Sequence, residues 1–143
     1  MEKRELSKAE WLDKCEAYCA RAEHCAADVQ RKLYEWGAPS DLYGFIEENL
    51  YKNGFLNDAR FCRAYVHDKV AYQSWGRLKI RAGLRALQLP ESAIREAMDE
   101  LDEEQYTANL RNLIAQRSSD TPDKRLRFLL QRGFTYDEIN AVS

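Results

Sequence analysis

The sequence predicts an all-α protein, an elongated, curved array of three tandem three-helix repeats. Three observations lead to this prediction. Glycine and proline are scarce, with six and three among 143 residues, whereas an all-β fold needs many tight turns. Hydrophobic residues make up 45% of the chain and charged residues 32%, a balance that fits a heavily helical globular protein. In addition, one pattern of helix, turn and helix recurs three times.

Each copy of the pattern contains an anchor leucine, a turn position four residues later and a helix break two residues after that. These positions are Leu33, Gly37 and Pro39 in the first copy, Leu84, Gln88 and Pro90 in the second, and Leu129, Gly133 and Thr135 in the third. A second amphipathic helix follows each break, and its equivalent positions in the three copies are Tyr43, Ile94 and Ile139. Glycine after a helical run is typical of a left-handed C-cap. Chance matches at helical spacing are the alternative explanation, but the matched turns favour a true repeat.

Capping signals place the individual helices. Ser7 and Glu10 form a capping box before the first helix, and Thr135 and Glu138 form another before the last. A further helical stretch precedes each anchor segment, at residues 9–22, 59–72 and 104–117, so about nine helices are expected. The expected organisation is a flexible N-terminus over residues 1–7, followed by repeats over residues 8–53, 54–101 and 102–143.

The repeat architecture favours binding over catalysis. One repeat of roughly 45 residues buries little apolar surface, so its stability alone is marginal. Neighbouring repeats are therefore expected to pack against each other through a shared apolar interface and form the array. Such an array suits an extended partner and does not naturally form a deep catalytic pocket. The chain has no Gly-rich phosphate loop and no HExxH motif. We therefore expect no enzyme activity, no catalytic residues and no cofactor.

The cysteines and the N-terminus indicate a cytoplasmic protein with reduced thiols. The charged start has no apolar run behind it, and no stretch reaches the length of a membrane span. Cys15, Cys19, Cys25 and Cys62 lack the paired CxxC spacing of strong zinc sites. A zinc site is conceivable near His24, but packing as small hydrophobes is the favoured interpretation, and we expect no metal.

Charge is distributed unevenly along this mildly acidic chain. Residues 60–95 carry eight basic and two acidic side chains, whereas residues 1–59 and 96–143 are each net negative by four. Arg77, Arg81 and Arg85 form one helical stripe at i, i+4 and i+8. The matching positions of the first repeat are Ala26, Gln30 and Tyr34, so the packing of the repeat does not require the stripe.

The basic block is either a solvated helix face or a docking surface for an anionic partner. We favour docking, because an unneutralised patch of this charge repels itself. The partner would be an acidic protein surface or nucleic acid phosphates. The candidate binding residues are Arg60, Arg63, Trp75, Arg77, Lys79, Arg81, Arg85, Lys124, Arg125 and Arg127.

Three segments resemble a known family. "GFLNDARFCRAYVHDK", "WGRLKIRAGLRAL" and the closing "KRLRFLLQRGFTYDEI" are similar to the RecX family of bacterial recombinase regulators, over roughly residues 15 to 143. The most specific matches are Phe55, Asp58, Phe61 and Tyr65, the run 76–84, and Arg132, Gly133 and Phe134. The chain departs from the family in its acidic balance, which puts independent DNA binding in doubt, and in Gln88, which stands where glycine is common.

The resemblance implies tandem three-helix repeats and a non-catalytic role. RecX proteins bind the RecA filament on DNA and inhibit its ATPase, strand exchange and coprotease activity, which limits recombination and the SOS response. By resemblance, we expect a monomer that binds the RecA filament, with DNA phosphates met as part of that filament, and no membrane. Two alternatives stay open. One is a helical protein that binds DNA directly without RecA, with a steep salt dependence, and the other is an unrelated helical scaffold.

Overall fold

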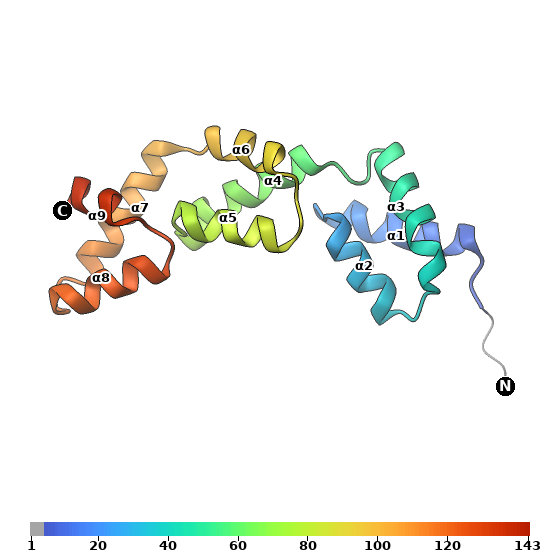
Figure 1. Ribbon diagram of the computed structural model, residues 1–143, viewed down its shortest axis with the longest axis horizontal. Coiled ribbons are helices and arrows are strands. Elements are labelled where there is room, and N and C mark those ends of the chain that lie inside the picture. The colour runs from blue at the N-terminus through green and yellow to red at the C-terminus, as the bar shows by residue number, and fades with distance from the viewer. Residues whose placement is uncertain (1–4) are drawn as a thin grey trace. The chain divides into compact units, whose positions relative to one another are not determined.

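The computed structural model describes residues 5–143 and contains only helices and connecting turns in that range. This confirms the all-α class. The chain forms two compact units, with the boundary between Phe61 and Cys62 (Figure 1). The first four residues of the expected flexible segment 1–7 lie outside the described residues. The curvature of the array and the three repeat boundaries stay predictions.

Unit 1 is built on three α-helices and a short 3-10 helix. Ser7 caps the first helix through its side chain, and Glu10 completes the expected capping box with hydrogen bonds of 3.2 and 3.0 Å. The helices are α1 (Lys8–Arg21), α2 (Ala26–Glu35), η1 (Ser40–Leu42) and α3 (Tyr43–Lys52), and α4 (Asp58–Asp68) begins in this unit. Their shared core consists of Trp11, Cys15, Cys19, Val29, Leu33, Ile46, Leu50 and Leu56.

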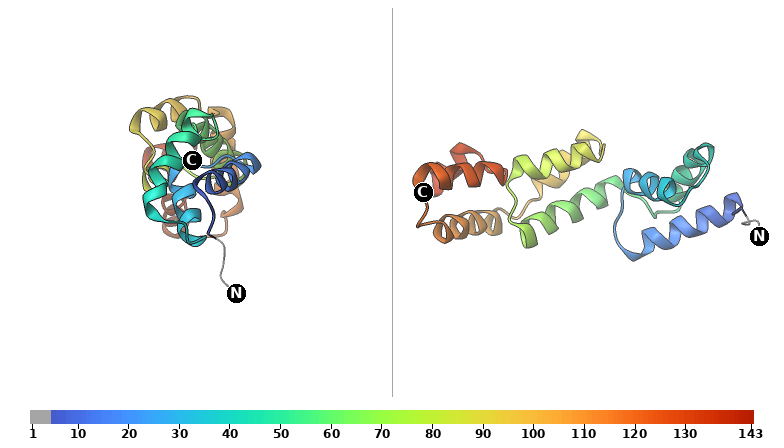
Figure 2. Two further views of the ribbon diagram at one scale, coloured as in Figure 1. Left: turned by 90° about the vertical axis from the view of Figure 1, so that its right-hand side faces the viewer. Right: turned by 90° about the horizontal axis from the view of Figure 1, so that it is seen from below.

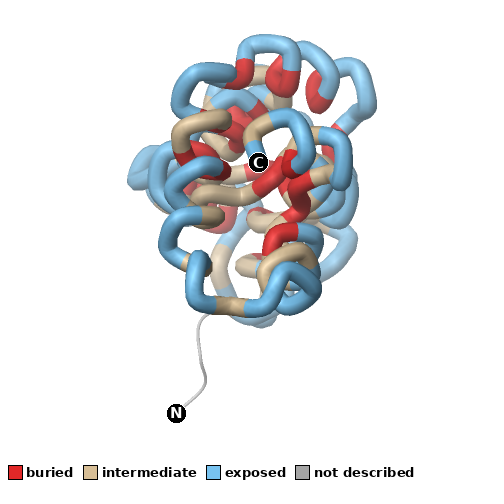
Figure 3. The backbone as a smooth tube through the Cα atoms, turned by 90° about the vertical axis from the view of Figure 1, so that its left-hand side faces the viewer, coloured by how far each residue is buried: buried red, intermediate tan, exposed pale blue. Residues whose placement is uncertain are grey.

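Unit 2 contains the remaining helices. After the end of α4 these are a π-helical turn η2 (Lys69–Gln73), α5 (Arg77–Ala86), α6 (Glu91–Asp99), α7 (Glu103–Gln116), α8 (Pro122–Gln131) and α9 (Tyr136–Val142). The orange and red ribbons of α7, α8 and α9 pack together (Figure 2). Buried positions recur between exposed ones along the helices, as expected of amphipathic helices (Figure 3). The largest fully buried side chains here are Ile80, Leu84, Ile94, Leu110, Leu129 and Phe134.

The three predicted anchor turns share one geometry. The anchor leucines Leu33, Leu84 and Leu129 are each at most 1% exposed. The carbonyl of each anchor accepts a hydrogen bond from the backbone N–H five residues later, at 2.9, 3.2 and 3.2 Å in chain order. The turn position between them has a positive φ in every copy, at 77°, 64° and 98° for Gly37, Gln88 and Gly133. This left-handed helix ending confirms the alignment of the three copies.

The departure at Gln88 does not alter the helix ending. Its φ of 64° lies in the left-handed region, which costs a side chain with a Cβ more than it costs glycine. The turn therefore keeps the conformation of its glycine counterparts. The surrounding packing of Leu84 and Leu89, both buried, holds the conformation in place.

Candidate partner-binding surface

The first arginine of the predicted stripe is engaged inside unit 2. Arg77 begins α5, and its guanidinium pairs with Glu103 on α7 and, at 2.6 Å, with Glu138 on α9. It also lies 4.3 Å from the ring centroid of Tyr106. Burial opposes the charge of Arg77, but its hydrogen bonds with both glutamates raise its pKa above the ordinary value. Arg77 therefore holds three helices together, and its charge is offset within the chain.

The other stripe residues differ from Arg77. Arg85 pairs with Glu91 at 2.7 Å, and both side chains are more than half exposed. An exposed ion pair of this type contributes little to the stability of the fold. Arg81 is half-buried and forms no ion pair among the described residues. Thus the structure does not present three equivalent free guanidiniums along α5, and a binding role for Arg77 stays a prediction.

Arg60 is also satisfied by its own unit. Its guanidinium pairs with Glu23 and donates to the carbonyls of Gly54 and Phe55, at 3.1 and 3.3 Å. Tyr51 adds a hydrogen bond of 2.7 Å to Asp58 in the same turn. Arg60 and Asp58 thus fasten the start of α4 to unit 1. Arg60 therefore has a structural role at this joint, and its docking role stays a prediction.

Trp75 lies at the centre of a group of cations. The ammonium groups of Lys69 and Lys79 each lie 4.4 Å from the Trp75 ring centroid, and Tyr65 meets the indole edge to face at 6.4 Å. Neither ammonium forms an ion pair with a carboxylate in residues 5–143. We call Lys69, Trp75 and Lys79 the Trp75 cluster. Cation–π contacts of this kind hold positive charge on the surface without neutralising it.

The local backbone explains how the cluster forms. The π-helical turn η2 ends at Ser74, whose φ of 52° is left-handed, and the backbone N–H of Trp75 donates to the carbonyl of Lys69 at 3.1 Å. This turn brings together two residues that a continuous helix would place about 120° apart around its axis. Arg132 supports the segment by donating to the carbonyl of Gln73.

The cluster and the arginine stripe lie on different sides of α5. At about 100° per residue, Lys79 lies roughly 160° from Arg81 around the helix. Gly83 lies on the Lys79 side of α5. A Cβ at Gly83 would lie 2.0 Å from the Tyr65 hydroxyl oxygen, so the glycine allows Tyr65 to approach the helix closely. Two large apolar side chains of the same segment are exposed, Tyr72 by 76% and Leu78 by 53%.

The basic residues of α8 divide in a similar way. Lys124 and Arg127 are exposed and lie outside any ion pair among the described residues. Arg125 is half-buried and donates to the carbonyls of Arg117 and Asp120, at 3.3 and 3.4 Å. Arg125 therefore closes the α7–α8 connection, and Lys124 and Arg127 stay available to a partner.

Comparison with known proteins identifies the family. A family model described as RecX, second three-helix domain, matches residues 57–98, the segment that carries the Trp75 cluster. A "Regulatory protein RecX" of Xanthomonas oryzae pv. oryzae (strain MAFF 311018) is 33% identical over 130 residues, which span 86% of this chain and 80% of that relative. The chain belongs to the RecX family. A "Regulatory protein RecX" of Leptothrix cholodnii is 29% identical over 131 residues, spanning 87% and 82% of the two chains.

Solved RecX structures share this fold. A crystal structure of regulatory protein RecX superposes with a TM-score of 0.79 at 20% identity, over 99% of this chain and 81% of that one. A crystal structure of RecX from Lactobacillus salivarius gives a TM-score of 0.76 at 18% identity, over 94% and 93%. The RecX family is one of regulatory proteins, which agrees with the expectation of a regulator.

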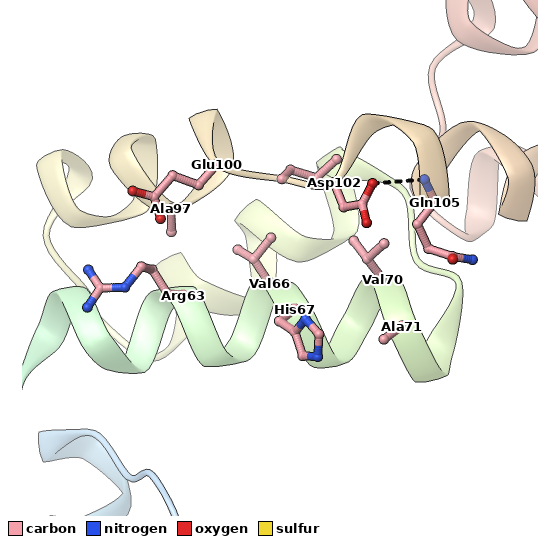
Figure 4. A pocket seen from close by; sticks show the side chains of 10 residues that line it. Arg63, Val66, His67, Val70, Ala71, Ala97, Glu100, Asp102 and Gln105 are labelled. Atoms are coloured by element: carbon pink, nitrogen blue, oxygen red, sulfur yellow. Dashed lines mark hydrogen bonds between the residues drawn. The ribbon is translucent and has the colours of Figure 1, made fainter.

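A cavity of about 340 Å³ accompanies α4 in this RecX-family chain. Figure 4 shows the Val66 side chain of α4 pointing toward Ala97, with Arg63 and His67 on the same helix and Asp102 and Gln105 at one end. Its rim carries both basic and acidic side chains. The cavity is therefore a weaker candidate than the Trp75 cluster for binding an anionic partner. Arg63 is exposed at this rim and forms no ion pair among the described residues.

The cysteines are buried. All four are free thiols, and burial raises the pKa of Cys15, Cys19 and Cys25 to about 11 in each case. Within residues 5–143, no group of three or more His, Cys, Asp or Glu side chains is arranged to hold a metal ion. The same residues include no helix that is long and apolar enough to cross a membrane.

Proposed function

We propose that this chain is a non-catalytic regulator that acts in the cytoplasm as a monomer on the RecA–DNA filament. It binds the filament and inhibits the ATPase, strand exchange and coprotease activities of RecA, and so limits recombination and the SOS response. Membership of the RecX family supports the regulatory role. The repeated helix–turn–helix geometry supports action by binding, because helical-repeat proteins typically act through binding surfaces.

The Trp75 cluster is the observation that carries the proposal at residue level. It places two uncompensated ammonium groups on one indole, inside the segment with the largest positive charge of the chain. Tryptophan is among the residues most enriched in interface hot spots, and Lys69 and Lys79 add positive charge beside it. Lys124 and Arg127 on α8 add positive charge in the same unit.

The partner of such a surface is anionic. Acidic side chains of the recombinase and phosphates of its DNA both satisfy this requirement, and the filament contains both. On binding, Lys69 and Lys79 exchange their contacts with the ring for ion pairs, and Trp75 is covered by the partner. Covering the indole excludes water from the ion pairs, which makes each charge contact stronger than it would be in solvent.

Charge reversal of the cluster tests the proposal. We expect the double variant Lys69→Glu/Lys79→Glu to need at least a tenfold higher concentration than wild type to inhibit RecA ATPase on single-stranded DNA. The matched control is Arg95→Glu/Arg111→Glu, which makes the same change of charge at two exposed positions of unit 2 that lack ion pairs among the described residues. The control should inhibit normally, and far-ultraviolet circular dichroism should confirm equal helicity.

Two results would contradict the proposal. If both double variants lose inhibition equally, net charge alone is responsible and the Trp75 cluster is not the site. If the wild type instead binds bare duplex tightly, with a steep salt dependence and no need for RecA, the chain is a direct DNA-binding protein. Arg77 is unsuitable for this test, because a carboxylate there would face Glu103 and Glu138.

A further inference from the structure

Unit 1 contains a hollow whose charge is opposite to that of its surroundings. The hollow has a volume of about 400 Å³ and is lined by residues of α1 and α2 and the short segments that follow each of them. Apart from one alanine, the lining residues are Lys14, Tyr18, Arg21, His24, Lys32 and Trp36. No acidic residue lines it, although residues 1–59 carry a net charge of minus four. The volume lies within the range of small-ligand pockets.

The aromatic walls form a right-angled corner. The rings of Tyr18 and Trp36 lie 6.0 Å apart at an angle of 82°. His24 stacks on Tyr18 at 3.9 Å and 16°, so the tyrosine ring is held in place from one side. All three residues are half-buried. A flat ring entering the corner stacks on one wall while its edge meets the other, an arrangement that aromatic pairs favour.

Cations surround this corner. The Lys14 ammonium lies 4.2 Å from the Trp36 centroid, and the Lys32 ammonium lies 5.7 Å from the Tyr18 centroid. Lys32 shares its charge with Glu35 at 3.5 Å, but Lys14 and Arg21 are exposed and have no ion pair among the described residues. Two positive charges thus remain for a ligand.

Flat aromatic walls and cations without ion pairs fit a ligand that is both planar and anionic. We propose that this pocket binds a nucleotide, whose base stacks in the Tyr18–Trp36 corner and whose phosphate is held by Lys14 and Arg21. The Lys14 ammonium, now over the indole, swings outward to the phosphate as the base takes its place. Arginine and lysine are the side chains that bind phosphate through charge-assisted hydrogen bonds.

The nucleotide can be free or part of a single strand, since the recognised chemistry is the same. Stacking on an aromatic side chain is tolerant of base identity, so a preference for one base is not expected. The site lies wholly in unit 1 and shares no residue with the Trp75 cluster of unit 2. The inference therefore does not depend on the RecA proposal and is tested separately from it.

Isothermal titration calorimetry of the full chain tests the pocket, with ATP, a short thymidine oligonucleotide and inorganic pyrophosphate as probes. We expect ATP, the oligonucleotide or both to bind, and pyrophosphate to bind at least tenfold more weakly. Binding of ATP assigns the pocket to free nucleotides, and binding of the oligonucleotide alone assigns it to a strand. The variant Lys14→Glu/Arg21→Glu should weaken binding at least tenfold, while the matched control Lys8→Glu/Lys52→Glu should not change it.

Three results would overturn the inference: binding of neither nucleotide probe, equal binding of pyrophosphate, or equal loss of binding in both variants. The pocket variant keeps Lys69 and Lys79, so its inhibition of RecA ATPase is measured in parallel. If nucleotide binding fails while the Trp75 cluster variant still loses inhibition, only the pocket assignment falls. Trp36→Leu provides a further check, because it keeps the charges and removes the stacking wall.

Discussion

Gly76 and Gly133 meet backbone against backbone in unit 2. A Cβ on Gly76 would lie 2.1 Å from the carbonyl carbon of Gly133. The N–H of Gly76 donates to the Arg132 carbonyl at 2.8 Å, and the N–H of Leu78 donates to the Gly133 carbonyl at 3.0 Å. The turn after α8 thus satisfies N–H groups at the start of α5 that have no acceptor within their own helix. The "WGR" and "RGF" segments of the sequence are the two halves of this joint.

Replacing Gly76 should therefore disrupt the joint. We expect Gly76→Ala to lower the free energy of unfolding by more than about 2 kcal/mol, because the added methyl meets rigid backbone. Thermal unfolding followed by circular dichroism measures the change. The control is Gly44→Ala on α3, where a Cβ meets nothing within 4 Å and the change should lie between zero and a gain of about 1 kcal/mol. Equal melting temperatures for Gly76→Ala and wild type would show that the contact is not tight.

The left-handed Gln88 offers a stabilising substitution. Gln88→Gly removes the strain of a Cβ at a φ of 64°, and we expect a gain of up to about 1 kcal/mol after the added flexibility of the unfolded chain is subtracted. Urea titration measures the gain as a higher midpoint. The reciprocal change Gly37→Gln, at the matching turn of unit 1, should lower stability by a similar amount. Loss of stability in Gln88→Gly would mean that the glutamine side chain makes a contact worth more than the strain.

Glu138 should make stability depend on acidic pH. Burial opposes its charge, but the N–H of Thr135, the hydroxyl of Tyr106 and the guanidinium of Arg77 together hold its pKa below the ordinary value of 4.5. The unfolded chain therefore takes up this proton before the folded chain does. The stabilising effect is complete above the unfolded pKa and is lost as pH falls through the lower, folded pKa.

Urea titrations between pH 6 and pH 3 check this dependence. Glu138→Gln should be less stable than wild type near pH 6 and should lose less stability as pH falls through roughly 4.5 and below. Glu104→Gln, a change at an exposed glutamate on α7, should leave the profile close to that of wild type. Parallel profiles for wild type and Glu138→Gln would contradict the assigned role of Glu138.

The sequence was sufficient for the turns because their determinants are local. The three anchor leucines and the turn positions four residues later lie within one helix ending each, and their pattern reports directly on burial and on left-handed φ. The capping boxes at Ser7 and Thr135 were predictable for the same reason, since each cap involves residues only three apart.

Which basic residues form ion pairs within the chain could not be predicted, because their partners are distant in the sequence. Periodicity places Arg77 on a face of α5, but its partner Glu138 lies 61 residues further along the chain. The role of Lys69 was missed because its contact with Trp75 requires the π-helical turn and the left-handed Ser74. Neither feature has a glycine or proline to mark it. The pocket of unit 1 was not predicted because the net charge was summed over residues 1–59. In that sum the cations of the pocket are outnumbered by acidic residues elsewhere in the segment.

The three anchor turns keep the same backbone geometry although the helices beside them differ widely in charge. A buried leucine and a left-handed residue recur at each reversal of a helix pair, whatever the charge of the neighbouring helix faces. Most of the exposed charged positions are thus separate from the positions that set the turns. A chain of this design can acquire a new ligand preference on one repeat by changing its outer residues, while the remaining repeats preserve the architecture unchanged.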